Sequence, residues 1–409
     1  MNQKIVFLFR KLEENQFTWP VLLNQLENSD FSDQLIIRGY ASASDIGNIL
    51  TEYPKSIVIF AYSFMTIHVP MIRYEVTQIR AQVSGSSIFI AGGPHATGDP
   101  EQTLKLGFDY IFIGDGEWTL RQFLQKLLEG NERSIEQLIK PDLPFFLDDS
   151  SPVSIHGTFI PPLEITRGCS YRCKFCQTGT LKPRHRSLAS VKEHLKRLQQ
   201  AGKHSRSGYI CPSAFQYEPD DSNQKESPVE TLLKLSKSAG ICHLEYGIFP
   251  SEVNPKTVNN AFLELITKYC SNKRITIGAQ AGTDQMLKSL NRSHTVQDVE
   301  NATHLIHQHG LRPQLDFIFG FPHETAQDRH QTLAWIKHLH HTYDARIQMH
   351  YFTPLAGSLY ANEKSSPLDS ETIASLNEFY NAGICTDWWK TGIEQTEILW
   401  NVLQELKQR

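Results

Sequence analysis

Short, wholly apolar runs alternate with longer amphipathic stretches through the first 150 residues of this chain. Runs that are apolar at every position are typical of parallel strands that are buried on both faces of a sheet. Their alternation with helix-like stretches predicts an α/β fold with an open, doubly wound (Rossmann-like) parallel sheet. The predicted strands are 5–9, 35–37, 57–62, 88–91 and 110–113.

The same alternation restarts beyond residue 162 and predicts six βα units of a partial parallel barrel of the TIM type. Helix starts are well marked there, as in Ser227-Pro228-Val229-Glu230, which combines an N-cap serine, a proline and a capping-box glutamate. The predicted strands are 163–166, 208–211, 243–249, 275–279, 315–319 and 346–352.

Four prolines with scattered serines and aspartates in residues 143–162 indicate a linker between the two halves. We therefore predict a doubly wound domain, a linker, a partial (β/α)6 barrel and a small C-terminal helical cap. Their predicted bounds are 1–145, 146–160, 161–357 and 358–409.

Composition excludes several classes of protein. A formal net charge of −4 argues against a protein that holds nucleic acid on a basic surface. The sequence has no run of about 18 apolar residues, so we expect no membrane span. The amino terminus lacks the apolar region of a secretory signal peptide, and we expect a cytoplasmic protein.

Three of the seven cysteines carry the most informative spacing. Cys169, Cys173 and Cys176 form Cys-x3-Cys-x2-Cys directly after a predicted strand. Three thiolates can bind three irons of a cubane cluster and leave the fourth iron open for chemistry. A zinc site usually has four ligands in pairs, whereas the next cysteine, Cys211, stands alone. Buried reduced cysteines are a further alternative, and disulfides are disfavoured by the odd cysteine count.

This spacing, with Phe175 before the last cysteine, resembles the radical S-adenosylmethionine (radical SAM) superfamily. The resemblance implies a [4Fe-4S] cluster on Cys169, Cys173 and Cys176, with the methionine part of SAM on the open iron. It also implies the partial barrel. By the same resemblance, the residues at strand ends that contact SAM are Ser213, Glu252, Gln280, Gly320 and Phe321.

The first half resembles the cobalamin (B12)-binding domain that is fused to many radical SAM enzymes. The resemblance is carried by the turns Gly92-Gly93-Pro94-His95 and Gly114-Asp115-Gly116-Glu117, together with Asp99-Pro100-Glu101 and Phe108-Asp109-Tyr110. Neither turn is the Gly-x-Gly-x-x-Gly dinucleotide fingerprint. The Asp-x-His-x-x-Gly signature, whose histidine is the lower cobalt ligand, is absent after the first strand. The lower ligand could therefore be His68 or His95, or the cobalt could have no protein ligand. A fold that has lost its cofactor is the alternative. The implied cobalamin contacts are Gly92, Gly93, His95, Gly114, Gly116 and Glu117.

Together these resemblances imply an enzyme that cleaves SAM reductively and transfers a methyl group to an unactivated carbon with the help of cobalamin. We expect a small-molecule substrate and an electron donor such as flavodoxin or ferredoxin. A cobalamin-independent radical rearrangement or cyclisation and a non-catalytic cobalamin or iron–sulfur sensor are alternatives. Methylthio transfer is disfavoured because that class carries three further cysteines, and none precedes Cys169.

Several residues keep two interpretations each. Cations beside the cysteines stabilise a negatively charged cluster or are simply exposed; they are Arg167, Arg172 and Lys174. His294 is a general base or only precedes the following helix, and we favour the second. Two lone cysteines, Cys211 and Cys385, are either thiol donors or buried apolar residues. Two tryptophans, Trp388 and Trp389, either close the mouth of the barrel over a substrate or pack against the domain beneath.

Overall fold

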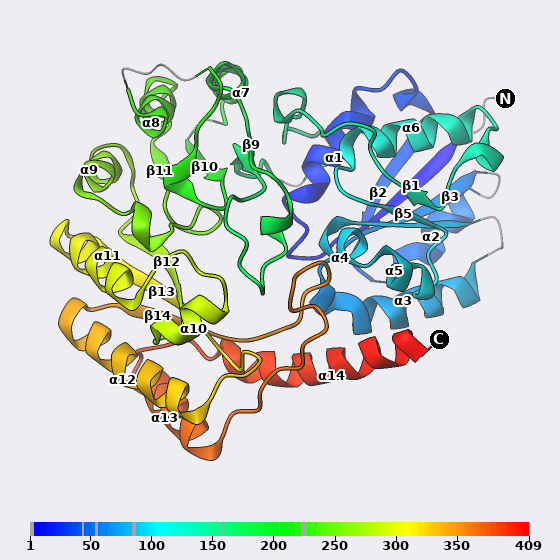
Figure 1. Cartoon of the computed structure of the whole chain (residues 1–409). Coiled ribbons are helices and arrows are strands. Elements are labelled where there is room, and N and C mark those ends of the chain that lie inside the picture. Colours follow the sequence, from blue (N-terminus) through cyan, green and yellow to red (C-terminus); the bar gives the residue numbers. More distant parts are fainter. Residues whose placement is uncertain are drawn as a thin grey trace. The chain divides into compact units, whose positions relative to one another are not determined.

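The chain folds into two α/β units whose segments interleave along the sequence, as a computed structural model shows (Figure 1). The structure describes residues 4–42, 45–53, 56–83, 87–157, 159–203, 205–221 and 226–408. The first unit comprises Met1–Pro161, Leu355–Ala361 and Glu397–Arg409, and the second comprises Pro162–Pro354 and Asn362–Thr396.

The first unit contains the predicted doubly wound sheet. Its strands are all parallel, in the order β2-β1-β3-β4-β5-β6. The strands are β1 (Ile5–Arg10), β2 (Leu35–Tyr40), β3 (Ile57–Ser63), β4 (Ile88–Gly92), β5 (Tyr110–Phe112) and β6 (Leu138–Ile139). The helices are α1 (Thr18–Glu27), α2 (Ile46–Glu52), α3 (Val69–Gln82), α4 (Gly93–Gly98), α5 (Pro100–Lys105) and α6 (Glu117–Leu128).

Side chains of β1 point alternately to two separate cores, which is why its first five residues, Ile5 to Phe9, are all apolar. Ile5, Phe7 and Phe9 pack with α1 and α6, while Val6 and Leu8 pack with α2 and α3 on the other face. Figure 1 shows these helices on opposite faces of the sheet. Because helices cover both faces of the sheet, every residue of the central strand β1 is buried, as expected for a parallel sheet.

The order of strands places a topological switch point between β1 and β3. In doubly wound sheets, ligands bind beyond the carboxyl ends of the strands at such a point. The turns that follow β3, β4 and β5 lie at this edge, and α4 begins directly after β4. The fold thus positions the Gly92-Gly93-Pro94-His95 turn where a ligand would bind.

The second unit carries the six predicted barrel strands, in two three-stranded parallel sheets ordered β11-β10-β7 and β12-β13-β14. The strands are β7 (Leu163–Glu164), β8 (Thr166–Arg167), β9 (Arg184–His185), β10 (Arg206–Ile210), β11 (His243–Glu245), β12 (Arg274–Gln280), β13 (Arg312–Phe319) and β14 (Arg346–Tyr351). The helices are α7 (Leu188–Gln200), α8 (Pro228–Ser238), α9 (Asn260–Tyr269), α10 (Asp284–Ser289), α11 (Val296–Gln308), α12 (Ala326–Tyr343) and α13 (Ser370–Asn381). The last helix, α14 (Trp388–Gln408), begins in this unit and ends in the first.

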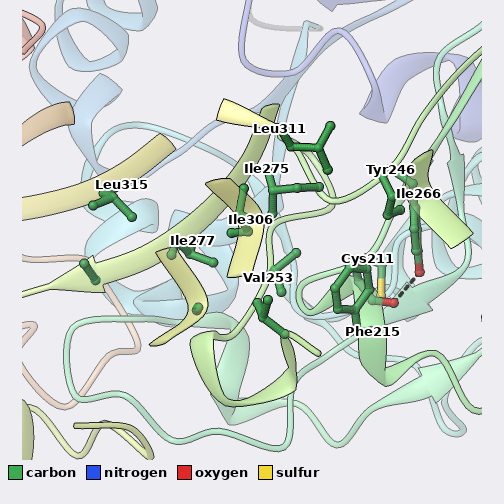
Figure 2. Packing of buried hydrophobic residues seen from close by; sticks show 14 of the residues in the cluster. Cys211, Phe215, Tyr246, Val253, Ile266, Ile275, Ile277, Ile306, Leu311 and Leu315 are labelled. Atoms are coloured by element: carbon green, nitrogen blue, oxygen red, sulfur yellow. Dashed lines mark hydrogen bonds between the residues drawn. The ribbon is translucent and has the colours of Figure 1, made fainter. Parts of the chain in front are cut away.

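One apolar core lies between the strands and the helices of this unit. Figure 2 shows Ile275 and Ile277 of β12 packed near Val253, Ile306 and Leu311. A bridge between Val253 and Ile277 connects the two sheets beyond the end of β11. The α/β fold class is therefore confirmed. The short strand β6 was not predicted.

The predicted domain bounds remain a prediction. The compact units group residues 397–409, at the end of α14, with the first unit through Leu399, Leu403 and Leu406, which belong to the core that contains α3. Among the residues that the structure describes, no helix combines the length and the apolar character needed to cross a membrane.

Candidate functional site

The loop of the three cysteines begins at a glycine that no other residue could replace without strain. Gly168 has φ +87°, and a Cβ there would collide with the backbone of Lys182. The amide of Cys169 donates to the carbonyl of Leu181 at 3.1 Å, and the amide of Cys176 donates to that of Cys173 at 3.1 Å. The loop is therefore held by its own backbone at the end of β8.

A second loop, after α10, is fastened to the cysteine loop. The amide of Lys174 donates to the carbonyl of Leu290 at 3.0 Å, and Asn291 Nδ2 donates to the carbonyl of Arg172 at 2.6 Å. These two hydrogen bonds bring Arg292 to the thiols, and its Nη1 donates to Sγ of Cys173 at 3.1 Å.

The three thiols are free and influence one another electrostatically. Burial raises the pKa of Cys169, the other two thiols raise it further, and Arg292 lowers it. Within the described residues, no three His, Cys, Asp or Glu side chains converge on one point, as a single metal ion would require. A cubane takes one thiolate per iron, so three separate soft thiolates on one loop are the donor set that fits a cluster.

Two carboxyl groups, Asp316 and Glu252, are close enough for the charge of one to change the pKa of the other. Burial, and then the charge of Glu252, raise the pKa of Asp316 from 3.8 to about 8. Burial also raises the pKa of Glu252, whereas Arg292 lowers it. Burial therefore raises the pKa of both carboxyl groups, and Arg292 opposes that rise only at Glu252.

Four polar atoms in this region are buried and have no hydrogen-bond partner. They are Ser213 Oγ, Gln280 Oε1, Asp316 Oδ1 and Arg292 Nε. An unmade buried hydrogen bond costs about 1–3 kcal/mol, so such groups usually find a partner in a ligand or water. Gln280 also has φ +70°, a strained conformation for a residue with a side chain. Acceptors and one cation beside the thiols are what SAM needs for its ammonium, ribose and carboxylate groups.

The predicted adenine-facing turn is anchored by a buried carboxylate. Glu324 Oε2 accepts from the amide of Gly320 at 2.7 Å, and burial raises the Glu324 pKa to about 7. Gly320 has φ +81°, and a Cβ there would enter the ring of Tyr351. Phe321 is fully buried, and its ring lies 5.4 Å from that of Phe175 in the cysteine loop. The turn and the cysteine loop are therefore neighbours.

The first unit brings its two glycine turns together. Gly93 has φ +86°, and a Cβ there would lie 2.7 Å from Ser63 Oγ and 2.9 Å from the amide of Phe64. The amide of Gly114 donates to Thr97 Oγ1 at 3.0 Å, which joins the turn after β5 to α4. Gly92 ends β4, Gly116 is the N-cap of α6, and Glu117 is buried at the first position of that helix.

His95 and His68 differ in their surroundings. His95 is fully buried, its Nδ1 lies 3.3 Å from Thr66 Oγ1, and its Nε2 has no partner. Burial lowers the His95 pKa to about 4, so the ring is neutral near pH 7. His68 instead accepts from the amide of Met65 at Nδ1 and lies 3.3 Å from Glu14 at Nε2. His95 thus has a free, buried nitrogen and His68 does not.

Where the Asp-x-His signature would begin, the structure has a buried ion pair. Nε of Arg10, at the end of β1, donates to both carboxylate oxygens of Glu75 at 2.9 Å. Tyr62 OH donates to Glu75 Oε1 at 2.9 Å. Both charged side chains are largely shielded from water, so this edge of the sheet is fixed by a paired charge rather than by a histidine.

The remaining sequence candidates lie outside this arrangement or at its margin. Arg167 pairs with Glu164 at 2.6 Å, and Arg172 is exposed. Cys211 and Cys385 are both buried, and burial raises the pKa of each to about 11. Trp389 is buried, whereas the half-exposed ring of Trp388 lies 5.3 Å from the ring of His350.

Sequence reasoning assigned no role to Arg292 or Asp316. The signal for Asp316 was a single carboxylate inside the otherwise apolar run 315–319, because a buried charge without a purpose is costly. Arg292 lies 119 residues from the cysteine that it contacts, and no local pattern indicated that contact.

Comparison with known proteins agrees with both halves of this description. The profile of the Radical SAM superfamily matches residues 163–336, and that of the B12 binding domain matches residues 16–124. Radical SAM domains imply a [4Fe-4S] cluster and SAM, and a B12-binding domain implies cobalamin.

Two solved structures are similar to this chain in fold. The radical SAM methyltransferase TsrM from Kitasatospora setae, solved with tryptophan substrate and a SAM analogue, has a TM-score of 0.61 at 16% identity. The match covers 87% of this chain and 75% of TsrM. The cobalamin-dependent radical enzyme OxsB, solved with aqua-cobalamin and SAM, has a TM-score of 0.59 at 16% identity, with 82% of this chain and 52% of OxsB covered.

Among curated proteins, the ribosomal protein uS12 methylthiotransferase RimO from Bdellovibrio bacteriovorus is 28% identical over 55% of this chain and 50% of RimO. An uncharacterized methyltransferase from Synechocystis is 24% identical over 61% of this chain and 46% of that protein. The chain spans about half of the length of these two relatives.

Proposed function

Because the chain joins a B12-binding domain to a radical SAM domain, we propose that it is a cobalamin-dependent radical SAM methyltransferase that acts on an unactivated carbon of a small molecule. In this reaction class, one electron from a flavodoxin- or ferredoxin-like donor reduces the cluster and then the sulfonium of SAM. The carbon–sulfur bond breaks to give methionine and a 5′-deoxyadenosyl radical, which removes a hydrogen atom from the substrate.

Three cysteines would hold the cluster in this proposal, and the polar groups around them would hold SAM. Cys169, Cys173 and Cys176 are the iron ligands. The observation that carries the proposal is the set of four buried, unpartnered polar atoms gathered with the acidic pair beside this loop. Their unmade hydrogen bonds favour a polar ligand at this place.

Each SAM-binding side chain has a chemical role in this proposal. Asp316 and Glu252 accept from the ribose hydroxyls and the ammonium, and Gln280 and Ser213 complete their hydrogen bonds on the same ligand. Arg292 is the cation for the carboxylate. The backbone of the turn at residues 320–321, held by Glu324, faces the adenine.

Cobalamin, when bound, would supply the methyl carrier. The chain's own contribution is the carboxyl edge of the first sheet, where Gly92, Gly93, Gly114 and Gly116 let the backbone approach a large ligand. Glu117 and His95 lie at the same edge as buried polar groups. The absence of a Cβ at Gly93, where one would clash with Ser63 and Phe64, supports a close backbone fit at that turn.

A methyl group, rather than a methylthio group, is the favoured cargo. Although the RimO relative is a methylthiotransferase, no cysteine precedes Cys169 in this sequence, so the first unit offers no thiolates for a second cluster. Methylthio transfer by that route would need such ligands.

Product analysis tests the proposal without knowledge of the substrate. The anaerobically reconstituted protein is incubated with cobalamin, SAM and a low-potential reductant, and the SAM-derived products are separated. We expect both 5′-deoxyadenosine and S-adenosylhomocysteine. 5′-Deoxyadenosine alone, with no cobalamin retained after gel filtration, would instead indicate a radical rearrangement or cyclisation. No SAM cleavage by a protein that carries a full cluster would refute the radical mechanism.

A further inference from the structure

Arg292 is held by contacts on both arms of its guanidinium group. Nη1 donates to Sγ of Cys173 at 3.1 Å, and Nη2 donates to the carbonyl of Gly278 at 2.9 Å. Nη2 also lies 3.5 Å from Nδ1 of His294. The two residues before it are tied to the cysteine loop, Leu290 through its carbonyl and Asn291 through its side-chain amide. The position of this cation relative to the thiol is therefore fixed by several contacts at once.

His294 has one arrangement of its ring proton that satisfies its surroundings. Nε2 lies 3.3 Å from the carbonyl of Ala279, which can only accept, so Nε2 carries the proton. Nδ1 is then an acceptor that faces Arg292. Burial, and next the charge of Arg292, lower the His294 pKa to about 4, which keeps the ring neutral near pH 7. His294 is thus a buried acceptor that orients the guanidinium group.

We infer that Arg292 is a permanent hydrogen-bond donor to the Cys173 thiolate, and that His294 is the positioning residue that holds it there, so that the pair sets the reduction potential of the cluster. This inference rests on the proposed function, because it requires a cluster on the cysteine loop. A charge-assisted N–H···S bond withdraws electron density from the sulfur. It stabilises the extra electron of the reduced cluster and raises the potential.

Two cations that neighbour the cysteines in sequence have different surroundings. Arg172 is adjacent to Cys173 in sequence, but its side chain is exposed and screened by solvent. Arg167 is paired with Glu164 at 2.6 Å. Arg172 therefore supplies general positive charge, whereas Arg292 supplies a directed hydrogen bond to Cys173.

A redox titration monitored by electron paramagnetic resonance tests the inference on the anaerobically reconstituted full chain without SAM. We expect Arg292→Gln to lower the reduced-to-oxidised ratio at a fixed poise about tenfold, which is about 59 mV for one electron. We expect Arg292→Lys, which keeps the charge but loses the fork, to fall in between. The matched control Arg172→Gln removes a neighbouring exposed charge and should titrate like the wild type.

Variants of His294 test its positioning role. His294→Phe removes the acceptor at Nδ1 and should shift the potential in the same direction by a smaller amount, while His294→Gln, whose amide oxygen can accept, should restore part of it. Iron and sulfide per chain are measured in every variant. Wild-type potentials for Arg292→Gln and His294→Phe with intact clusters overturn the inference alone. Failure of the wild type to assemble any cluster overturns the proposed function as well.

If Arg292→Gln does not assemble a cluster, Arg292→Lys and His294→Phe decide the inference. A potential unchanged from the wild type in both of them refutes it, and a lowered potential in both supports it. A shift for Arg172→Gln as large as that for Arg292→Gln also refutes it, because general charge rather than a directed hydrogen bond would then set the potential.

Discussion

Replacing Asp316 by asparagine is expected to stabilise the second unit and to weaken the binding of SAM. The carboxyl group of Asp316 is buried, its Oδ1 has no partner, and its pKa is raised from 3.8 to about 8. Because the folded-state pKa lies above the unfolded value, stability from the protonated carboxyl is fully present below about pH 4. It is lost as the pH rises towards 8.

The size of the effect follows from that shift. Between the unfolded pKa of 3.8 and pH 7, about three units at 1.36 kcal/mol each correspond to an upper limit of about 4 kcal/mol. Mutual influence with Glu252 divides this cost between two groups, so we expect Asp316→Asn to gain about 2 kcal/mol at pH 7. Near pH 4 the gain should vanish.

Hydrogen exchange of the amides in β13 measures this gain, because it reports the opening free energy of one element in a chain with two units. The exposed Asp220 offers the control Asp220→Asn, which should change little at any pH. SAM binding to Asp316→Asn should weaken about tenfold or more, since a hydrogen bond to a charged group contributes about 1.5–3 kcal/mol. A gain in stability that does not grow from pH 5 to pH 8 would refute the assigned burial cost.

Three further substitutions examine other parts of the molecule. Cys173→Ser should reduce bound iron and sulfide to near zero by elemental analysis, whereas Cys242→Ser, at an exposed cysteine, should leave both unchanged. Gly93→Ala should weaken cobalamin retention on gel filtration at least tenfold, because its Cβ would clash with Ser63 and Phe64 and displace the turn. Gly130→Ala, which has a positive φ but open space around it, should cost only about 1 kcal/mol and retain cobalamin. Glu75→Ala leaves a buried guanidinium unpaired and should destabilise the first unit by about 3–5 kcal/mol in urea unfolding; a loss below 1 kcal/mol would contradict that.

Local patterns were enough to predict the strands and the cysteine loop. The strand at 5–9 is recognisable because both faces of β1 are buried, so that no polar residue interrupts it. The three cysteines lie within eight residues, so a short window of sequence contains the whole pattern that resembles a cluster-binding loop. The strand β6 escaped because two residues carry no periodic signal.

Contacts between distant segments could not be predicted in the same way. Arg292 and Cys173 are 119 residues apart, and an arginine after a helix is usually exposed. Glu324 accepts a hydrogen bond from the amide of Gly320, four residues earlier. The Gly-Phe-Pro sequence of that turn does not by itself indicate this contact. Such pairings depend on how the elements close in space, and sequence windows contain no information on that.

The last turns of α14 contribute residues to the core of the first unit, so this core is completed late during synthesis. Leu399, Leu403 and Leu406 complete a core whose other residues come from the first 111 positions, and Arg73 binds Glu405 at 2.6 Å. During synthesis, amino-terminal domains generally fold as they emerge. Here the core of the nascent first unit stays incomplete, with one apolar face of α3 uncovered, until residues 399–406 have left the ribosome. A chaperone that shields this face in the interval would act on an intermediate that the chain's own topology makes unavoidable.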